Sequence, residues 1–427
     1  MWQAVEVETW MARRTSRLGA VKETVQGIIG QVRDSGDKAL IELAEKFDKV
    51  HLDTIAVDED AREAAYEKVD PKVTESLVEA EARISRFHEL QLPRGLWLNE
   101  TEPGITLGVK TTPLSRIGTY VPGGRAAYPS TALMCTVPAR IAGVSEICCC
   151  SPPPIQPLTL IALDIAGVDE IYQCGGAQAI AAMALGTETI EPVEKIVGPG
   201  NVYVTAAKMM LREYAEIDFP AGPSEIAVIA DEGAVPAYVA ADIIAQAEHD
   251  PNAACLLIAT SEKISHTIGE EVKKQAGAAQ RKEIIAKALE NSGYIIAGDL
   301  REAVAIANTV AAEHLSIQVT DPLPVLSGIR NAGAIFVGPY TPVACGDYAS
   351  GTNHVLPTAG YARQYSGLDV HHFCKTSSVQ ILSREGLESI GDIIETLATA
   401  EGLSAHAASV RVRRQEKKGG HTGPSKN

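Results

Sequence analysis

The 427-residue sequence lacks any apolar run that approaches the length of a membrane-spanning helix. It also lacks the apolar core of a secretory signal peptide, because the N-terminal stretch MWQAVEVETWMARR carries acidic side chains early. Basic side chains are too few to balance the acidic ones, and the net charge is −16. Such a surface repels phosphate backbones. We therefore expect a cytoplasmic protein that binds neither membranes nor nucleic acids.

The eight cysteines contain no C-x-x-C pair. Three of them, Cys148, Cys149 and Cys150, follow one another in the stretch EICCCSPPP. This pattern fits the end of a buried strand, where thiols behave as small apolar groups, and it suggests a reducing compartment. A cysteine-rich metal site is the less favoured interpretation, because adjacent strand residues point to opposite faces of a sheet.

The pattern of apolar residues changes along the chain. Residues 1 to about 90 have helical apolar spacing, whereas from about 115 short β-rich runs alternate with Ala-rich helical stretches. This alternation predicts βαβ units and mainly parallel sheets with helices on both faces. The strands suffice for two sheets, and the break at residues 217–225 is a plausible crossover between them. A chain of this length allows two or three domains.

The stretch VPAYVAADIIAQAEHDP contains no H-E-x-x-H motif, so a zincin-type protease is not supported. Its apolar spacing predicts a helix that Pro251 limits. Gln246 and His249 are three residues apart and share a helix face, so the two could hold one ion, whereas Glu248 points away from Gln246. The alternative is a helix C-terminus at which His249 only satisfies the last carbonyl groups.

The stretch DLREAVAIANTVAAEHLSIQV predicts a helix to about Ala312, followed by a strand. Glu313 and His314 then lie at the helix–strand junction, and strand ends of α/β sheets are where sites are built. An adjacent carboxylate and imidazole can serve as two bases for two proton transfers. The alternative is a charged turn without a chemical role.

Two further segments carry polar residues that could bind a metal or act as bases. Residues 338–358 form a long Gly- and Pro-punctuated segment with Asp347 and His354, and loops of this length are usually functional. Asp347 could instead be an Asx-turn residue. The stretch AEGLSAH places Glu401 and His406 on a C-terminal helix, where His406 in isolation reads as a surface residue.

No G-x-G-x-x-G motif occurs at a strand–helix turn. The stretch GGAQAIAAMALG lacks the required spacing, and VGPGN is a tight Gly-Pro turn. Motifs alone therefore do not predict dinucleotide binding.

Taken together, these segments resemble the histidinol dehydrogenase family from about residue 10 to residue 412. The resemblance lies in IDFPAGPSE…QAEH, AAEHL, GDYASGTNHVLPT and AEGLSAH, and also in YVPGGRAAYPS, CGGAQAIAAMALGT and KIVGPGNVYVTAAK. It implies oxidation of L-histidinol to L-histidine in two NAD-dependent steps through an aldehyde, the last step of histidine biosynthesis. The family binds NAD on an incomplete Rossmann-like sheet without the glycine fingerprint.

The resemblance also implies the residues of the site. His314 would accept the protons, and Glu313 would activate the water that hydrates the aldehyde. One Zn²⁺ per subunit would be held by Gln246, His249, Asp347 and His406, the last supplied by the partner subunit of a homodimer through an exchanged C-terminal arm. The expected substrate contacts are Ser224, Gln246, His249, His314, Asp347, His354, Glu401 and His406. The expected NAD contacts are Tyr120, Gln178 and Asn201.

We accordingly expect an α/β fold with two incomplete Rossmann-like parallel-sheet domains, helical N- and C-terminal extensions, and an arm-exchanged homodimer. The expected parts are an N-terminal helical extension (residues 1–20), a larger α/β domain with the metal and catalytic residues (21–115 with 226–369), an NAD-binding domain (116–225), a C-terminal helical dimerisation arm (370–412) and a disordered tail (413–427).

The sequence shows one departure from the family and leaves three alternative functions open. Ala312 stands where many relatives carry Pro, which should loosen the junction slightly. A family relative could oxidise another small polar alcohol such as a sulfonated diol, although Glu401 and His354 favour an imidazole substrate. The same ligands could serve a zinc hydrolase in which Glu313 activates water, or a purely structural metal that holds the dimer.

Overall fold

The computed structural model describes residues 2–14, 18–123, 127–220 and 222–415. It divides into two compact units, which are described separately: unit 1 comprises Met1–Leu92 and Leu114–Phe373, and unit 2 comprises Pro93–Pro113 and Cys374–Asn427. No helix within the described ranges is long and apolar enough to cross a membrane. Of the tail expected to be disordered, residues 413–415 continue the last helix, and residues 416–427 lie outside the described part.

Unit 1 contains two five-stranded sheets, each with all strands parallel. Sheet A has the order β10 (Gly293–Ile296), β9 (Ala254–Ala259), β8 (Glu225–Ala230), β11 (His314–Gln318) and β12 (Ala334–Val337). Sheet B has the order β5 (Glu170–Gln173), β4 (Glu146–Ser151), β3 (Arg116–Tyr120), β6 (Lys195–Val197) and β7 (Glu216–Ile217). Both follow the strand order of a Rossmann fold without its sixth strand. The prediction of parallel sheets is confirmed.

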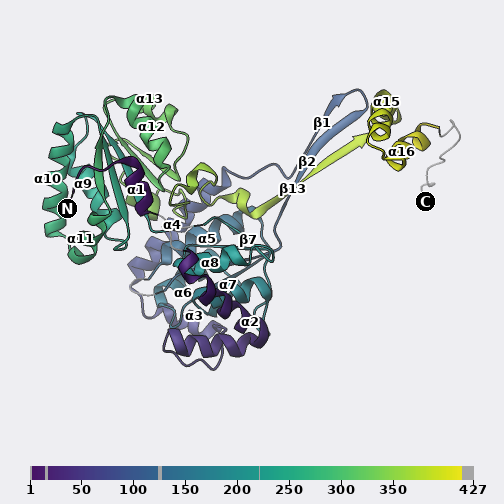
Figure 1. The fold of residues 1–427 in the computed structure, drawn as a ribbon. Coiled ribbons are helices and arrows are strands. Elements are labelled where there is room, and N and C mark those ends of the chain that lie inside the picture. Colours follow the sequence, from purple (N-terminus) through teal and green to yellow (C-terminus); the bar gives the residue numbers. More distant parts are fainter. Residues whose placement is uncertain (1, 15–17, 124–126, 221, 416–427) are drawn as a thin grey trace. The chain divides into compact units, whose positions relative to one another are not determined.

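Sheet A is covered by helices on both faces, and its central strands β9, β8 and β11 are buried at every position. Ile226 and Val228 of β8 point into one core, and Ala227 and Ile229 point into the other. Figure 1 shows α9, α10 and α11 along one face and α12 with α13 along the other. The helices are α9 (Pro236–Ala247), α10 (Glu262–Ala278), α11 (Lys282–Glu290), α12 (Leu300–Val310) and α13 (Pro322–Gly328). Crossover helices of this kind connect successive parallel strands.

Sheet B is covered in the same way. One face packs on α2 (Leu18–Phe47), α7 (Gly176–Leu185) and α8 (Val202–Met210), and the other on α4 (Pro71–Glu89), α5 (Pro129–Ala142) and α6 (Pro157–Ala166). The three consecutive cysteines alternate between these cores: Cys148 and Cys150 point to one, Cys149 to the other. Burial raises the pKa of the Cys148 and Cys149 thiols to about 12, so they are inert packing groups.

The N-terminal helices pack on the helices of sheet B. Helix α2 contacts α7 and α8, α3 (Glu59–Tyr66) contacts α6, and α4 contacts α5. This contact pattern differs from the expected grouping of residues 21–115 with residues 226–369. The physical reason is that an amphipathic pattern shows that a helix is buried on one side without showing which sheet buries it.

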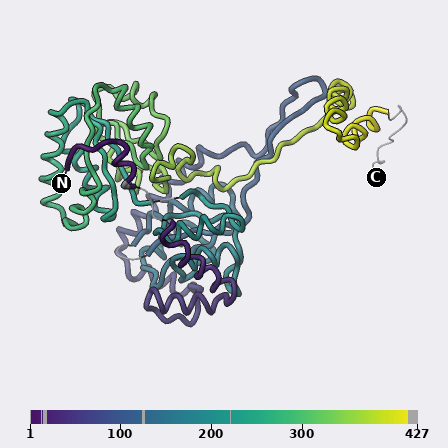
Figure 2. Tube along the Cα trace, in the orientation of Figure 1, coloured from purple at the N-terminus to yellow at the C-terminus, as the bar shows by residue number. Residues whose placement is uncertain are grey.

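The first residues of the chain join the edge of sheet A. Val5 N–H donates to the Tyr294 carbonyl and Tyr294 N–H to the Gln3 carbonyl, both at 3.0 Å. Helix α1 (Val7–Arg13) follows, and its Trp10 is fully buried in the core that contains Ala227 and Ile229. Figure 2 shows this purple segment beside the teal and green chain of sheet A. The N-terminus is therefore an integral part of unit 1.

Unit 2 contains a three-stranded antiparallel sheet and two helices. The strand order is β1 (Leu96–Glu102), β2 (Ile105–Pro113) and β13 (Cys374–Leu382), so strands about 270 residues apart in the chain are paired. Helices α15 (Arg384–Ala400) and α16 (Ser404–Gln415) follow, and Arg414 pairs with Glu388, Asp392 and Glu395 of α15. The remaining elements, α14 (Val343–Tyr348) and the short helices η1 (Tyr361–Arg363) and η2 (Val370–Phe373), belong to unit 1.

Candidate active site

Glu313 and His314 lie at the amino end of sheet A. His314 is the first residue of β11 and is in register with Ile226 of the neighbouring strand β8. Helix α12 ends at Val310, two residues before the predicted end, because Ala311 adopts a left-handed conformation with φ 50°. That conformation costs roughly 1–2 kcal/mol for a residue other than glycine. Open α/β sheets usually bind ligands at their carboxyl ends, so this location differs from the usual one.

The His314 imidazole is held as a neutral base. Its Nδ1 lies 3.2 Å from the Glu225 carbonyl oxygen, and because a carbonyl only accepts, Nδ1 carries the proton and Nε2 keeps a free lone pair. Burial lowers the pKa of His314 to about 4; the Asp347 carboxylate opposes this shift, and the nearby His249 and His354 add to it. At pH 7 the ring is therefore uncharged and able to accept a proton.

The Glu313 carboxyl group is also buried, with its side chain 7% exposed. Burial raises its pKa well above the usual range, and the charges of Glu225 and Asp347 act in the same direction. Hydrogen bonds from the Glu225 N–H, at 2.8 Å, and from Ser224 act against the shift. Oε2 lies 3.5 Å from His314 Nδ1, but the His314 ring is uncharged at pH 7, so the two do not form an ion pair. A cation bound nearby would lower the pKa of Glu313 again.

Gln246 lies in the last turn of α9, which confirms the predicted helix, whereas the helix ends at Ala247 and His249 lies in the turn that follows it. The Gln246 side chain is 2% exposed, and its amide nitrogen is buried without a hydrogen-bond partner among the described residues. The orientation of an amide is an assignment, so a rotated amide would place a carbonyl oxygen in the same position. His249 lies near enough to His314 and His354 to lower the pKa of both rings.

Asp347 and His354 lie on and after the short helix α14. The His354 ring places Nδ1 3.0 Å from the Asp347 main-chain oxygen and Nε2 3.5 Å from Thr131 Oγ1 in the first turn of α5. Burial lowers the pKa of His354. Asp347 acts electrostatically on Glu313, His314 and His354, so the structure brings these four groups together. The segment after α14 that carries His354 therefore contacts α5, a helix that packs on sheet B.

These residues fit a metal ion only in part. The described residues contain no cluster of three or more His, Cys, Asp or Glu side chains that could hold a metal ion. Unit 1 supplies two such side chains of the expected set, His249 and Asp347, together with the unpaired amide of Gln246. The C-terminal end of α9, where Gln246 and His249 lie, favours a cation. Glu401 and His406 lie in unit 2, at the end of α15 and in α16.

Asp242 is a buried carboxylate that the sequence analysis did not assign. It lies on α9 one turn before Gln246, is 5% exposed, and accepts the N–H of Val343 at 3.3 Å. Val343 begins α14, so Asp242 connects the helix that carries Gln246 to the helix that carries Asp347. Burial raises its pKa to about 6. The sequence feature that could have indicated Asp242 as a buried polar residue is its position inside the apolar stretch AADIIA.

Asp242→Asn is expected to stabilise the protein at neutral pH. The raised folded-state pKa means that the carboxyl group ionises more easily in the unfolded chain, so stability is lost as the pH rises from about 4 to about 6. Asparagine keeps an acceptor for the Val343 N–H without the charge. We expect at most about 3 kcal/mol of added stability at pH 8 and roughly half of that at pH 5. Urea unfolding of the metal-free protein at both pH values measures this, and a pH-independent difference would contradict it.

The other expected binding residues lie at the carboxyl ends of sheet B. Tyr120 ends β3, and its hydroxyl accepts the N–H of Gly176 at 3.0 Å. Asn201 caps α8, which follows β6, and Gln178 is buried in the first turn of α7. Because β3 and β6 are the neighbouring strands at which the order reverses, Tyr120 and Asn201 lie at the topological switch point, where dinucleotides bind in such sheets.

A buried ion pair holds the turn between β6 and α8. Lys208 Nζ lies 2.7 Å from Asp218 Oδ1 and 2.6 Å from the Gly198 carbonyl oxygen, and Gly198 N–H donates to Asp218 Oδ2 at 2.8 Å. Gly198 has φ 115°, and a Cβ there would lie 2.2 Å from the Tyr120 carbonyl oxygen. The tight turn is evident from the sequence, whereas Lys208 and Asp218 are not, because a lone lysine in a helical stretch carries no distinguishing signal.

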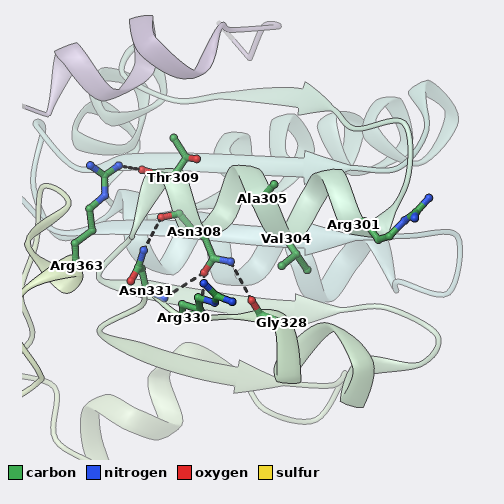
Figure 3. A pocket seen from close by; sticks show the side chains of 9 residues that line it. All are labelled: Arg301, Val304, Ala305, Asn308, Thr309, Gly328, Arg330, Asn331 and Arg363. Carbon is green, nitrogen blue, oxygen red and sulfur yellow. Dashed lines mark hydrogen bonds between the residues drawn. The ribbon is translucent and has the colours of Figure 1, made fainter.

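The surface of unit 1 also carries a cavity of about 530 Å³ beside α12. Its lining residues are Arg301, Val304, Ala305, Asn308, Thr309, Gly328, Arg330, Asn331 and Arg363, and in the described part of the chain no expected site residue is among them. Figure 3 shows the Asn308 side chain bonded to the chain around Gly328 and Arg330, and Arg363 directed at the Thr309 carbonyl. These polar groups are occupied in joining α12 to the segment before β12.

Comparisons with known proteins agree over nearly the whole chain. A sequence model described as histidinol dehydrogenase matches residues 11–414. Histidinol dehydrogenase of Methanosarcina barkeri is 51% identical over 404 residues, which cover 94% of this chain and 93% of the relative. That of Methanothermobacter thermautotrophicus is 50% identical over 394 residues, covering 91% and 92%. The crystal structure of histidinol dehydrogenase from Elizabethkingia anophelis is 38% identical, with a TM-score of 0.93 over 97% of both chains.

Proposed function

Because the chain belongs to the histidinol dehydrogenase family, we propose that the residues around Glu313 and His314 form its active site. The chain is an NAD-dependent oxidoreductase of histidine biosynthesis with histidinol as its substrate. The observation that supports this site best is the neutral His314 ring, whose Nδ1–H is bonded to the Glu225 carbonyl oxygen and lies 3.5 Å from the buried Glu313 carboxyl group, which leaves Nε2 to accept a proton.

The two residues act in sequence in the proposed mechanism. His314 Nε2 accepts the hydroxyl proton of L-histidinol as the alcohol becomes the aldehyde. Glu313 then takes a proton from the water that adds to the aldehyde, and His314 accepts the hydroxyl proton of the resulting hydrate as it becomes L-histidine. NAD, when bound, would supply the hydride acceptor for each of the two oxidations. General bases of this kind typically contribute about 10²–10⁴-fold to the rate.

We propose that Gln246, His249 and Asp347 hold one Zn²⁺ together with His406. The buried unpaired amide of Gln246 supports this assignment, as does the N and O donor set, which zinc commonly takes in four positions. When bound, the ion supplies positive charge that orients and polarises the alcohol oxygen. Among the other proposed substrate contacts, Ser224 and His354 lie beside Glu313 and Asp347, and Glu401 would accept an ammonium or imidazole N–H.

For NAD we propose Tyr120, Gln178 and Asn201 as contacts. Their positions at the carboxyl end of sheet B, two of them at the switch point, support the assignment. Asn201 caps α8 at that point by accepting the N–H groups of Tyr203 and Val204, and the positive end of the helix dipole there favours an anionic group such as a pyrophosphate.

We further propose a homodimer with an exchanged C-terminal arm, so that His406 and Glu401 of one subunit complete the site of the other. Unit 2 exposes large apolar side chains that a partner would cover, namely Leu96, Trp97, Leu98, Ile381, Ile393, Leu397, Leu403 and Val412. A cytoplasmic location stays a prediction.

The decisive test is NADH formation on addition of L-histidinol. Two NADH should form per histidinol, and prior removal of metal by a chelator should abolish the reaction until Zn²⁺ is restored. A sulfonated diol serves as the matched substrate control, because its anionic end should be rejected by Glu401 and the histidines. Absence of an NADH signal with histidinol, or preference for the diol, would sink the proposal.

Gly198→Ala should raise the KM for NAD by about tenfold or more, because a displaced turn misplaces the groups that hold the dinucleotide. The new Cβ would meet the Tyr120 carbonyl oxygen at 2.2 Å, and alanine is strained at φ 115°. Initial rates over a range of NAD concentrations measure the change. The control is Gly277→Ala in α10, where a Cβ meets nothing within 4 Å. Equal KM values for NAD in the two folded variants would refute the assignment.

A further inference from the structure

A buried ion pair between Arg14 and Glu225 lies next to Glu313 and His314, and Glu225 is hydrogen-bonded to both. Arg14 Nη1 is 2.8 Å and 2.9 Å from the two carboxylate oxygens of Glu225, and the two side chains are 4% and 1% exposed. Taking two charges this far from water has a desolvation cost that their attraction offsets only when the geometry is good. Fold stability is therefore a weak explanation for the pair, and its surroundings indicate another role.

Glu225 contacts both residues of the proposed proton-transfer pair. Its main-chain N–H donates to Glu313 Oε2 at 2.8 Å, and its main-chain oxygen accepts from His314 Nδ1 at 3.2 Å. Its carboxylate Oε1 accepts the Glu313 N–H at 3.3 Å and the Ala359 N–H at 3.1 Å. One residue thus fixes the Glu313 carboxyl group, the His314 ring and the backbone that carries them.

Arg14 holds the other side of the same junction. Its Nη2 donates to the carbonyl of Val310, the last residue of α12, at 3.0 Å. The Arg14 guanidinium carbon lies 4.4 Å from the ring centre of the fully buried Trp10. This cation–π contact holds the arginine side chain in place. Arg363 caps the preceding carbonyl, that of Thr309, as Figure 3 shows. Two arginines therefore neutralise the C-terminal end of α12 immediately before Glu313.

This support matters because the junction has little rigidity of its own. Ala311 is held in the left-handed region, and Ala312 lacks the ring that would fix φ in a proline. Strained backbone of this kind persists only where the surrounding structure holds it in place. The bonds from Arg14 and Glu225 reach the backbone on both sides of the strained residue, at Val310 and at Glu313.

We propose that Arg14 and Glu225 are positioning residues for the reaction, which set the direction of His314 Nε2 and of the Glu313 carboxyl group. The N-terminal segment is then a part of the active site, although Arg14 is 211 positions from Glu225 in the chain. The proposal rests on the proposed roles of Glu313 and His314. Misplacement of a reacting group by about 1 Å can lower a rate roughly 100-fold, so loss of this support should reduce kcat more than substrate binding.

The test compares Arg14→Met, Glu225→Gln and the double variant in the zinc-loaded full-length protein. Each single change leaves one buried charge without its partner, so we expect a lower Tm and a kcat reduced about 10- to 100-fold. The double variant removes both charges and should recover most of the Tm. Its kcat should stay low, because Val310 and the Glu313 N–H still lack charged partners. The KM for histidinol should change less than threefold.

If the double variant recovers Tm but not kcat, the two residues position the reacting groups rather than only stabilise the fold. If the double variant regains wild-type kcat and the wild-type pH profile of kcat, or if the single variants keep wild-type kcat per folded site, the proposal is overturned. Where Arg14→Met does not fold, Arg14→Lys decides: it keeps the charge but reaches Glu225 and Val310 less well together. An intermediate kcat supports the proposal, and a wild-type kcat overturns it.

Two measurements separate this inference from failure of the proposed function. Zinc content and calorimetric binding of histidinol show whether each variant has a loaded site, and an inactive wild-type protein would refute the proposed function before any variant is compared. Arg116→Met is the matched control: Arg116 is a largely buried arginine paired with Glu146 and Glu170 at the amino end of sheet B. It should lower the Tm while kcat remains that of the wild type.

Discussion

His314→Ala is expected to lower kcat by about 10³-fold or more while zinc stays bound. The ring takes a proton in both oxidations, and a single general base typically contributes about 10²–10⁴-fold to one step. Its Nδ1 is already bonded to the Glu225 carbonyl oxygen and its pKa is lowered to about 4, so Nε2 is the free base at pH 7. Steady-state NADH formation measures kcat, and metal analysis of the purified variant measures zinc.

The control for this change is His371→Ala, which removes an exposed imidazole from η2 and should leave kcat unaltered. Retention of wild-type activity by His314→Ala, with zinc present, would mean that the metal is structural or that another base serves. Loss of zinc from His314→Ala would instead place the ring among the metal ligands.

His406→Ala should lower zinc affinity and abolish most activity, and mixing with a second variant should restore part of it. The second variant, Glu313→Gln/His314→Ala, keeps His406 on its C-terminal arm but lacks the proton-transfer residues in unit 1, here called the body. If arms are exchanged, each heterodimer contains one site with an intact body and an intact arm. Half of randomly mixed dimers are heterodimers, so activity should return to about one quarter of the wild-type value.

The two variants measured alone are the controls, since neither homodimer can form an intact site. Heterodimers are verified with two different affinity tags, and subunits are mixed under conditions that allow exchange. Verified heterodimers without any regained activity would argue that each site is built from one subunit.

The elements of sheet A show which parts of the fold were accessible from the sequence. Runs such as EIAVIA and ACLLIAT are apolar at successive positions, which is typical of parallel strands buried on both faces. The structure confirms strands β8 and β9 at these positions. The predicted end of α12 was wrong by two residues, because Ala311 takes a conformation that alanine rarely adopts and that no residue pattern announces.

The residue types of the site could be predicted from the sequence, but its location in the fold could be predicted less well. Glu313, His314, Asp347 and His354 act on one another in the structure, as a shared site requires. The rule that ligands bind at the carboxyl ends of strands does not locate this group, which lies at the amino end of β8 and β11. At that end α9 reaches its C-terminus, whose carbonyl groups favour a cation, whereas the last carbonyl groups of α12 are paired with Arg14 and Arg363.

Local patterns in the sequence thus determined the alternation of strands and helices, the chemistry of the candidate residues and the family to which the chain belongs. Tertiary structure alone decided that Arg14 meets Glu225, that Asp242 joins α9 to α14, and that α2 covers sheet B. The physical reason is that periodicity follows from the geometry of a few neighbouring residues. The partner of a buried charge or of an apolar face instead depends on which distant segments the folded chain brings together, and many partners satisfy the same local pattern.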